Sequence, residues 1–189
     1  MLGEGDGRCV ARLVQLAPQA RIHCVDKSRD MLARAASRLA ADWRGSRRVR
    51  FEHADVFSAY FAPAHYDAVV TLFFLDCFPT ERVAALRDKI QESLKPEAHW
   101  LFADFAIPDR GWRRWRARVW LAVLYAFFRW QTGLAARSLP DSERLLAEAG
   151  WRPEALREFQ SGLVRTVLFQ REAVGAAAAL PLARSRNAS

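Results

Sequence analysis

The sequence contains few of the residues that mark specialised protein classes. Its three cysteines, Cys9, Cys24 and Cys77, are too widely spaced for a disulfide framework or a Cys-x-x-Cys metal or redox site. Nine glycines and eight prolines are too few for a fibrous or low-complexity protein. The apolar run at 119–128 has ten residues, too short to span a bilayer, and no charged-then-apolar leader opens the chain. We therefore expect a globular cytoplasmic protein.

Lysine is also scarce, and the positive charge is concentrated in one segment. The chain holds 29 basic residues against 21 acidic ones, and only three of the basic residues are lysine. Residues 110–137 contain seven arginines and no acid, so the rest of the chain is nearly neutral. An arginine bias with abundant alanine is more typical of a GC-rich genome than of a surface that contacts many phosphates. Nucleic acid is therefore not the expected partner.

Helix-like and strand-like segments alternate over the first 107 residues. Helical periodicity covers 8–17, 28–39 and 80–94, with Ser28 and Thr80 as expected N-caps. Strand-like apolar segments cover 21–26, 49–53, 66–72 and 99–107, and a loop is expected at 44–46. This alternation predicts an α/β fold, a doubly wound, Rossmann-like and mostly parallel sheet with helices on both faces.

The sequence after residue 140 predicts that the mostly parallel sheet ends in antiparallel strands. A short helix is expected at 141–149, closed by Gly150, followed by strands at 156–160 and 163–170. Only Ser161 and Gly162 separate these strands, which predicts a C-terminal antiparallel hairpin. The domain would cover 1–172, interrupted by an arginine- and tryptophan-rich helical insertion at 109–138. We expect the alanine-rich tail at 173–189 to be disordered.

A glycine-rich turn and two aspartates stand at the ends of predicted strands. Leu2-Gly3-Glu4-Gly5-Asp6-Gly7 precedes the first helix, and its alternate glycines let the backbone turn sharply and approach a ligand. Asp26, nineteen residues beyond Gly7, ends the next strand, where a carboxylate can accept both hydroxyls of a ribose. Asp55 ends the following strand, where it can face the exocyclic amine of an adenine. Together these positions predict a site for an adenosine-containing ligand.

These motifs resemble those of the class I S-adenosylmethionine-dependent methyltransferases. The resemblance covers about residues 2–170. It rests on the glycine turn, on Cys-Val-Asp-Lys-Ser at 24–28 followed by Met31 and Leu32, on His-Ala-Asp-Val at 53–56, on Tyr-Asp-Ala-Val-Val at 66–70, and on Leu-Lys-Pro at 94–96. The family fold is a seven-stranded sheet, parallel except for its last strand, which fits the expected hairpin. The resemblance implies a methyltransferase with S-adenosylmethionine as cofactor.

The resemblance also implies a set of cofactor-binding residues. The glycine turn would cradle the methionine portion, the Asp26 motif would hold the ribose, the Asp55 motif would contact the adenine, and the end of the family's fourth strand would border the methyl group. In that order the set is Gly3, Glu4, Gly5, Asp6, Gly7, Asp26, Lys27, Met31, Asp55, Val56, Leu72 and Phe73. A nicotinamide-dependent dehydrogenase is the alternative, but its third glycine usually follows the second by three residues, unlike the Gly-x-Gly-x-Gly here.

The sequence departs from the family pattern at its beginning. The family normally has a strand before the glycine turn, and this sequence starts at Met1 without it. We interpret the sequence as a fragment, or as one whose start is placed too far downstream. A non-catalytic or truncated binding domain is then the alternative to an active enzyme. Glu97 and Ala98 stand where many relatives have glycines, a turn detail of little consequence.

The expected methyl acceptor is a small, lipophilic molecule. Methyl transfer from a sulfonium requires alignment in a dry pocket, so the sequence predicts no dedicated catalytic residue. Asp76, after the family's fourth strand, is a candidate base or polar anchor. The family commonly inserts its substrate cap after the fifth strand, where this chain has its insertion. Trp112, Trp115 and Arg116 are therefore candidate substrate contacts.

Three interpretations of the insertion remain open. It could be a helix that packs on the domain with its arginines reaching water, a lid over a lipophilic or acidic substrate, or an interfacial helix in which 110–133 contacts a membrane. A nucleic-acid methyltransferase that uses these arginines is a further alternative. The histidines, His23, His53, His65 and His99, have no metal-ligand spacing, so no metal is expected. The oligomeric state stays open.

Overall fold

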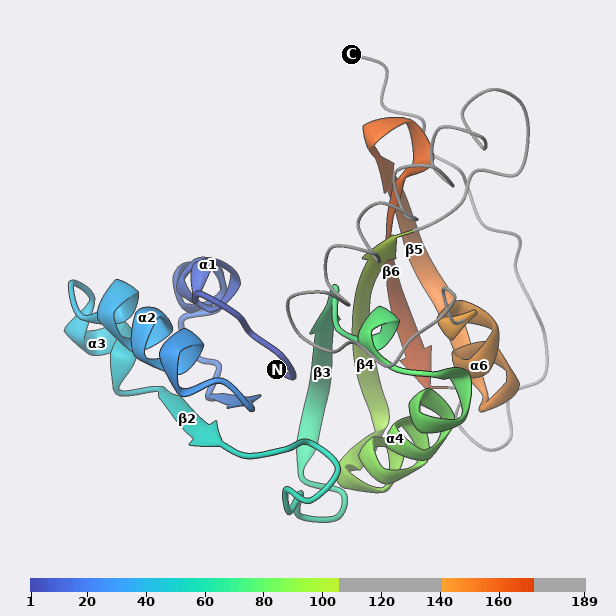
Figure 1. The fold of residues 1–189 in the computed structure, drawn as a ribbon, viewed down its shortest axis with the longest axis horizontal. Coiled ribbons are helices and arrows are strands. Elements are labelled where there is room, and N and C mark those ends of the chain that lie inside the picture. Colours follow the sequence, from blue (N-terminus) through green and yellow to red (C-terminus); the bar gives the residue numbers. More distant parts are fainter. Residues whose placement is uncertain (106–140, 172–189) are drawn as a thin grey trace.

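The computed structural model describes residues 1–105 and 141–171 (Figure 1). Its helices are α1 (Arg8–Leu16), α2 (Arg29–Leu39), α3 (Trp43–Ser46), α4 (Thr80–Ser93) and α6 (Ser142–Glu148). Its strands are β1 (Ile22–Asp26), β2 (Val49–His53), β3 (Tyr66–Leu72), β4 (Leu94–Phe105), β5 (Trp151–Phe159) and β6 (Val164–Arg171). Short 3-10 turns occupy Leu75–Cys77 and Gln160–Gly162. The expected alternation of helices and strands is therefore present.

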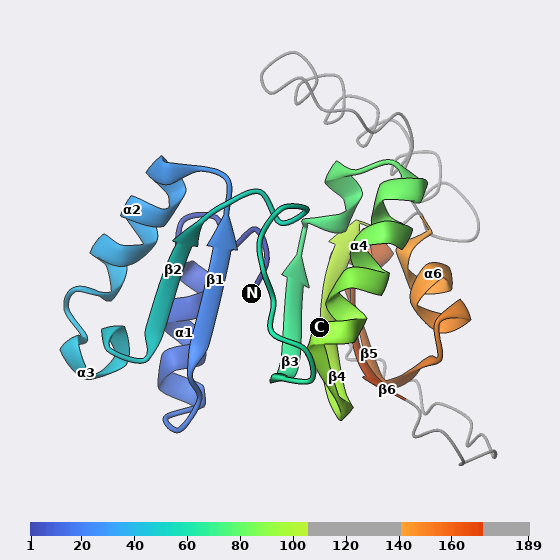
Figure 2. The ribbon, with the colours of Figure 1, turned by 90° about the horizontal axis from the view of Figure 1, so that it is seen from below.

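The strands form two adjoining groups. β1 and β2 pair in parallel, with Ile22 opposite Val49. The second group has the order β3-β4-β6-β5, in which β3 and β4 are parallel and β6 is antiparallel to both of its neighbours. The arrows of β1, β2, β3 and β4 point the same way in Figure 2. The predicted class, an α/β fold with a mostly parallel sheet and a C-terminal antiparallel hairpin, is confirmed.

Leu2 joins the two groups. It forms single parallel bridges to Val25 of β1 and to Thr71 of β3. Apart from these single bridges, residues 1–105 and 141–171 contain no strand between β1 and β3. The amino terminus lies between these two strands in Figure 2. Residues 1–3 therefore occupy the centre of the sheet.

Apolar side chains cover both faces of the sheet. One cluster places Val10 and Val14 of α1 and Leu39 of α2 against Cys24. The other packs α4 and α6 against β3, β4 and the terminal hairpin, and it includes Val25 from β1. Because neighbouring residues of a strand point to opposite faces, Cys24 and Val25 contribute to different clusters. The site-bearing strands are thus held from both sides.

Some expected boundaries are wrong. The loop expected at 44–46 belongs to α3, because Asp42 Oδ1 accepts a hydrogen bond from the Gly45 amide at 2.8 Å and closes a helical turn. Pro79, not Thr80, is the N-cap of α4, whereas Ser28 caps α2 as expected. β4 begins at Leu94, directly after α4, because Leu94 pairs with Tyr66 ahead of a register shift.

Several expectations fall outside the described residues. The insertion at 109–138 lies in the gap between 105 and 141, and so do Trp112, Trp115 and Arg116. The tail at 173–189 lies beyond residue 171, where the description ends. Within 1–105 and 141–171, no helix is long and apolar enough to cross a membrane.

Candidate functional site

The glycine turn follows Leu2 and leads into α1. Gly3, Gly5 and Gly7 all have left-handed backbone conformations, with φ of 63°, 69° and 87°. A Cβ on Gly3 would lie 2.1 Å from Cδ2 of Phe74, and one on Gly7 would lie 2.4 Å from Cα of Ala35. A Cβ on Gly5 would meet no atom within 4 Å. Gly3 and Gly7 thus permit close packing, whereas Gly5 borders open space.

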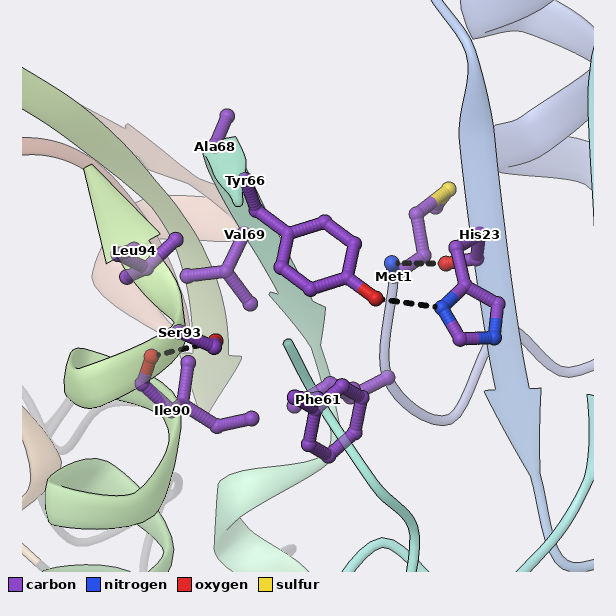
Figure 3. A pocket seen from close by; sticks show the side chains of 10 residues that line it. Met1, His23, Phe61, Tyr66, Ala68, Val69, Ile90, Ser93 and Leu94 are labelled. Carbon is purple, nitrogen blue, oxygen red and sulfur yellow. Dashed lines mark hydrogen bonds between the residues drawn. The ribbon is translucent and has the colours of Figure 1, made fainter. Parts of the chain in front are cut away.

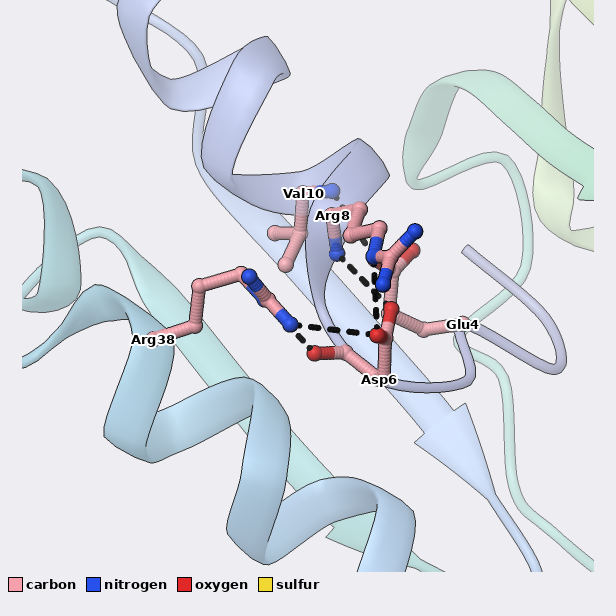
Figure 4. A network of polar contacts seen from close by, with 5 residues as sticks. All are labelled: Glu4, Asp6, Arg8, Val10 and Arg38. Carbon is pink, nitrogen blue, oxygen red and sulfur yellow. Dashed lines mark hydrogen bonds and ion pairs between the residues drawn. The ribbon is translucent and has the colours of Figure 1, made fainter.

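Glu4 and Asp6 hold the turn in different ways (Figure 4). Oε1 of Glu4 accepts a hydrogen bond from the Val10 amide at 2.9 Å, in the first turn of α1. Its other oxygen, Oε2, is buried without a hydrogen-bond partner, and burial raises the pKa of Glu4. Asp6 instead pairs with Arg8 at 3.0 Å and with Arg38 of α2 at 3.1 Å. Asp6 therefore links the turn to α2 through Arg38, whereas Oε2 of Glu4 is a hydrogen-bond acceptor without a partner.

Asp26 connects the end of β1 with the glycine turn. Its Oδ2 accepts a hydrogen bond from the Gly5 amide at 3.3 Å, and its Oδ1 accepts one from the Ser28 amide at 2.8 Å. The Ser28 hydroxyl in turn accepts a hydrogen bond from the Met31 amide, so hydrogen bonds connect the strand end with the start of α2. The Asp26 carboxylate is thereby fixed at the carboxyl edge of the sheet, where ligands of open α/β sheets bind.

The Asp55 motif follows β2 at the same edge. Oδ1 of Asp55 accepts the Phe57 amide at 2.9 Å, and Oδ2 lies 3.6 Å from Nζ of Lys27, whose side chain is largely exposed. The Val56 side chain is buried in the core cluster. Met31 is exposed. The structure therefore brings Lys27 and Asp55 together at this edge.

The end of β3 adds an aromatic surface. Leu72 is the last residue of the strand, and Phe73 follows it with φ of 52°, an unfavourable value for a bulky residue. The Phe73 amide donates to the Ala103 carbonyl at 2.7 Å, which keeps the backbone against β4. Phe73 is 44% exposed, and the centroid of its ring lies 5.0 Å from that of the Phe105 ring. Two aromatic rings therefore lie beside the strand ends.

The segment after β3 and the end of β4 carry a pair of buried carboxyl groups, Asp76 and Asp104. Oδ2 of Asp104, near the end of β4, accepts the Asp76 amide at 3.1 Å, and the two side chains also interact. Burial and the neighbouring carboxyl raise the pKa of Asp104 to about 9, and burial raises that of Asp76. Burial and Asp76 likewise raise the pKa of the Cys77 thiol to about 12. At neutral pH the pair therefore retains a proton.

This pair predicts an unusual pH dependence of stability. The unfolded-state pKa of an aspartate is near 3.8, below the folded value for Asp104 of about 9. The folded protein thus binds more protons between these values, and its free energy of unfolding falls as pH rises through them. Asp104→Asn removes this titration, so the variant should gain stability over the original chain by a few kcal/mol on going from pH 5 to pH 9.

Urea denaturation at several pH values measures this difference. The exposed Asp30 of α2 provides the control, because Asp30→Asn should follow the pH dependence of the original chain. Equal pH slopes for Asp104→Asn and the original chain would contradict the buried, proton-sharing pair.

The site as a whole is a line of groups along one sheet edge. From β2 to β4 it runs from Asp55 and Lys27 through Asp26 and the glycine turn to Phe73. The buried carboxyl pair lies at the ends of β3 and β4. Sequence reasoning missed Asp104, although an acid between the apolar residues of Phe102-Ala103-Asp104-Phe105 is a detectable signal. It also missed the free oxygen of Glu4, which depends on the turn's conformation. The arrangement can bind a nucleoside through its hydroxyls and present an apolar surface next to it.

Comparison with known proteins agrees with this geometry. Residues 1–97 match the family described as a methyltransferase domain. None of the curated proteins matches the sequence significantly. Among solved structures, an O-methyltransferase family 2 protein from Planctomyces limnophilus, in complex with apigenin, is 18% identical with a TM-score of 0.71, over 90% of this chain and 49% of that one.

Two further structures have similar folds. The mitomycin 7-O-methyltransferase MmcR is 20% identical with a TM-score of 0.68, over 90% of this chain and 48% of that one. A S-adenosylmethionine-dependent methyltransferase from Mesorhizobium loti is 22% identical with a TM-score of 0.62, over 90% of this chain and 88% of that one. The chain thus spans about half the length of the two O-methyltransferases. Identities at this level show a shared fold.

Proposed function

Because this chain belongs to the methyltransferase domain family, we propose that it transfers the methyl group of S-adenosylmethionine to a small, lipophilic molecule. The observation that carries the proposal is the position of Asp26. Its carboxylate accepts a hydrogen bond from the Gly5 amide at the end of β1. Its carbonyl accepts one from the amide of Ala54, the residue before Asp55. A nucleoside that crosses this edge would meet both aspartates and the open side of the glycine turn at once.

The residues of the turn fit the methionine end of the cofactor. Gly5 has free space where a side chain would project, which leaves the backbone open to a ligand. Oε2 of Glu4 is a buried acceptor without a partner, and an ammonium group is the ligand chemistry that would satisfy it. Glu4 would therefore hold the amino group of the methionine portion, and the Gly5 backbone would pass alongside it.

The remaining contacts follow from the same edge. Asp26 would accept the ribose hydroxyls, and Asp55, with Lys27 beside it, would border the adenine. The bound sulfonium supplies an activated methyl group, so the protein has to position the acceptor and exclude water. The rings of Phe73 and Phe105 provide an apolar wall at the end of β3. The proton that Asp76 and Asp104 share would provide a polar anchor at the same strand ends.

A small acceptor is supported by the nature of the structural neighbours. One of them is named as a mitomycin 7-O-methyltransferase, and another was solved with apigenin. An aromatic, hydroxyl-bearing acceptor would suit the exposed Phe73 ring, because aromatic rings gain energy from stacking in addition to burial. The insertion would complete the acceptor side through Trp112, Trp115 and Arg116.

Calorimetry and product detection test this function separately. We expect S-adenosylmethionine to bind at micromolar concentrations in isothermal titration calorimetry. With a panel of phenolic acceptors, we expect formation of S-adenosylhomocysteine, detected by mass spectrometry. No heat of binding at millimolar cofactor would reject the cofactor assignment. Binding without product for any acceptor would instead favour the alternative of a non-catalytic binding domain.

A further inference from the structure

Residues 55–59 form one hydrogen-bonded turn, the Asp55 turn, at the start of the connection from β2 to β3. The Asp55 carbonyl accepts hydrogen bonds from the amides of Ser58 at 2.9 Å and of Ala59 at 2.8 Å. Oδ1 of Asp55 accepts the hydrogen bond of the Phe57 amide at 2.9 Å. Because one carboxylate oxygen is held inside the turn, the direction of the Asp55 side chain depends on where the turn lies.

A lysine of α4 binds the carbonyl groups of this turn. Nζ of Lys89 donates to the Val56 carbonyl at 3.1 Å and to the Phe57 carbonyl at 2.7 Å. A turn that does not continue as a helix leaves such carbonyls without a partner in its own backbone, and a lysine ammonium is a suitable donor for them. Lys89 is partly buried, so salt screens these charge-assisted bonds less than at an open surface. Lys89 therefore connects the Asp55 turn to α4.

An arginine of the same helix covers an aromatic ring of the turn. The guanidinium carbon of Arg82 lies 3.8 Å from the centroid of the Phe57 ring and 5.9 Å from that of the Phe78 ring. Phe57 and Phe78 pack edge to face, with their ring centroids 5.2 Å apart. A cation above an aromatic face is attracted by the quadrupole of the ring. α4 therefore holds Phe57 by its side chain as well as by its carbonyl group.

The rest of the connection lies against α4 as well. Val56 and Ala59 are buried in the core cluster to which α4 contributes Ile90. The centroid of the Phe61 ring lies 5.6 Å from Nζ of Lys89, and Phe61 and Ile90 line the same small pocket (Figure 3). In Figure 2 the connection crosses the sheet on the side of α4. The position of the Asp55 turn is therefore set by this helix.

Aromatic rings connect the Asp55 turn with the glycine turn. Phe78 packs edge to face on Phe74, with ring centroids 5.2 Å apart. Phe74 lies so close to Gly3 that a Cβ on this glycine would be 2.1 Å from Cδ2 of the ring. Phe57, Phe78 and Phe74 thus form a continuous row of rings between the two turns. The contacts of α4 therefore also help to set the spacing between the two turns.

We propose that Lys89 and Arg82 are positioning residues for the recognition of adenine, an inference that rests on the proposed function. Oδ2 of Asp55 lies 3.6 Å from Nζ of Lys27, longer than a hydrogen bond, so this oxygen can accept one from the exocyclic amine of the base. The two side chains of α4 hold the turn so that Oδ2 meets this amine, and they act through Asp55 without touching the cofactor. Hypoxanthine, which has a carbonyl oxygen in place of the amine, cannot donate this hydrogen bond.

Lys89→Met and Arg82→Met test the proposal, with Arg87→Met as the matched control. Methionine keeps an unbranched apolar side chain and removes the donors and the charge. Arg87 is also a cation of α4 that donates to a backbone carbonyl, that of Leu145 at 2.9 Å, so its loss removes a similar contact away from the Asp55 turn. Isothermal titration calorimetry measures the affinity of each protein for S-adenosylhomocysteine and for S-inosylhomocysteine, which carries hypoxanthine as its base.

The preference for adenine over hypoxanthine separates positioning from a general loss of stability. Lys89→Met should bind S-adenosylhomocysteine about tenfold more weakly than the original chain, because binding must then order the turn. Arg82 is exposed, so Arg82→Met should lose about threefold. Affinity for the inosyl compound should change little in both variants, and Arg87→Met should keep the original preference. An equal loss for both compounds in Lys89→Met would overturn the proposal.

Hydrogen exchange without ligand distinguishes a failure of this inference from a failure of the proposed function. The Ser58 and Ala59 amides, which donate to the Asp55 carbonyl, should exchange about tenfold faster in Lys89→Met and at the original rate in Arg87→Met. If the original chain binds neither compound, the cofactor assignment is rejected, whatever the exchange rates. If the original chain binds and Lys89→Met has unchanged exchange and preference, only the positioning role is overturned.

Discussion

Asp26→Ala is expected to weaken S-adenosylmethionine binding by about ten- to a hundredfold, the effect of losing charge-assisted hydrogen bonds to a ligand. Without the carboxylate, the ribose hydroxyls would lose their acceptor, and the Gly5 amide would lose the hydrogen bond that it makes at 3.3 Å. Asp26→Asn keeps one acceptor oxygen, so its affinity should lie between those of the original chain and Asp26→Ala. Isothermal titration calorimetry of the three proteins gives the dissociation constants.

Asp30→Ala serves as the comparison for this loss. Asp30 lies four residues further on, in the first turn of α2, and is exposed. Asp30→Ala removes one negative charge from the same region but changes no residue at the sheet edge. Equal affinities for the original chain and Asp26→Ala, in proteins with similar melting temperatures, would mean that the nucleoside binds elsewhere.

Gly7→Ala is expected to have the largest effect on stability, a loss of about 2–4 kcal/mol. The new methyl group would lie 2.4 Å from Cα of Ala35, where α2 cannot move away without leaving its own packing. The backbone at φ of 87° is also unfavourable for alanine. Urea denaturation measures the change in the free energy of unfolding.

Gly5→Ala, in contrast to Gly7→Ala, should affect cofactor binding more than stability. Its φ of 69° carries a similar conformational penalty, about 1 kcal/mol, but the methyl group meets no protein atom within 4 Å. The methyl group would project into the space proposed for the cofactor. We therefore expect a large loss of cofactor affinity and a small loss of folding stability. A Gly5→Ala protein that binds the cofactor normally would contradict the placement of the methionine portion against this turn.

The fold was predictable because its pattern is local. Periodic apolar residues in 80–93 and β-branched residues in 66–72 identify their elements without tertiary information. The short separation of the last two predicted strands indicates a hairpin, although in the structure β5 already begins at Trp151 and residues 160–163 connect it to β6. Gly150 confirms the expected end of α6 with φ of 85°. Boundaries failed where a single contact decides them, as where the Asp42 side chain closes α3 around Gly45.

The site was predictable only in part, for a physical reason. Strand ends in a parallel sheet meet at one edge, so Asp26 and Asp55 could be assigned to that edge from order alone. The direction of a side chain cannot be derived in this way. Val56 points into the core, Asp6 pairs with two arginines, and Asp104 meets Asp76 across 28 positions of sequence. These outcomes depend on packing between distant elements.

The position of Leu2 has a mechanical consequence. Within the described residues it supplies the backbone link between β1–β2 and the other four strands, and the glycine turn begins at the next residue. Any twisting of one half of the sheet against the other would pivot near this residue. A nucleoside clamped between Asp26 on one half and Phe73 on the other would resist that twisting. Binding of the nucleoside at this edge would then also stiffen the whole sheet.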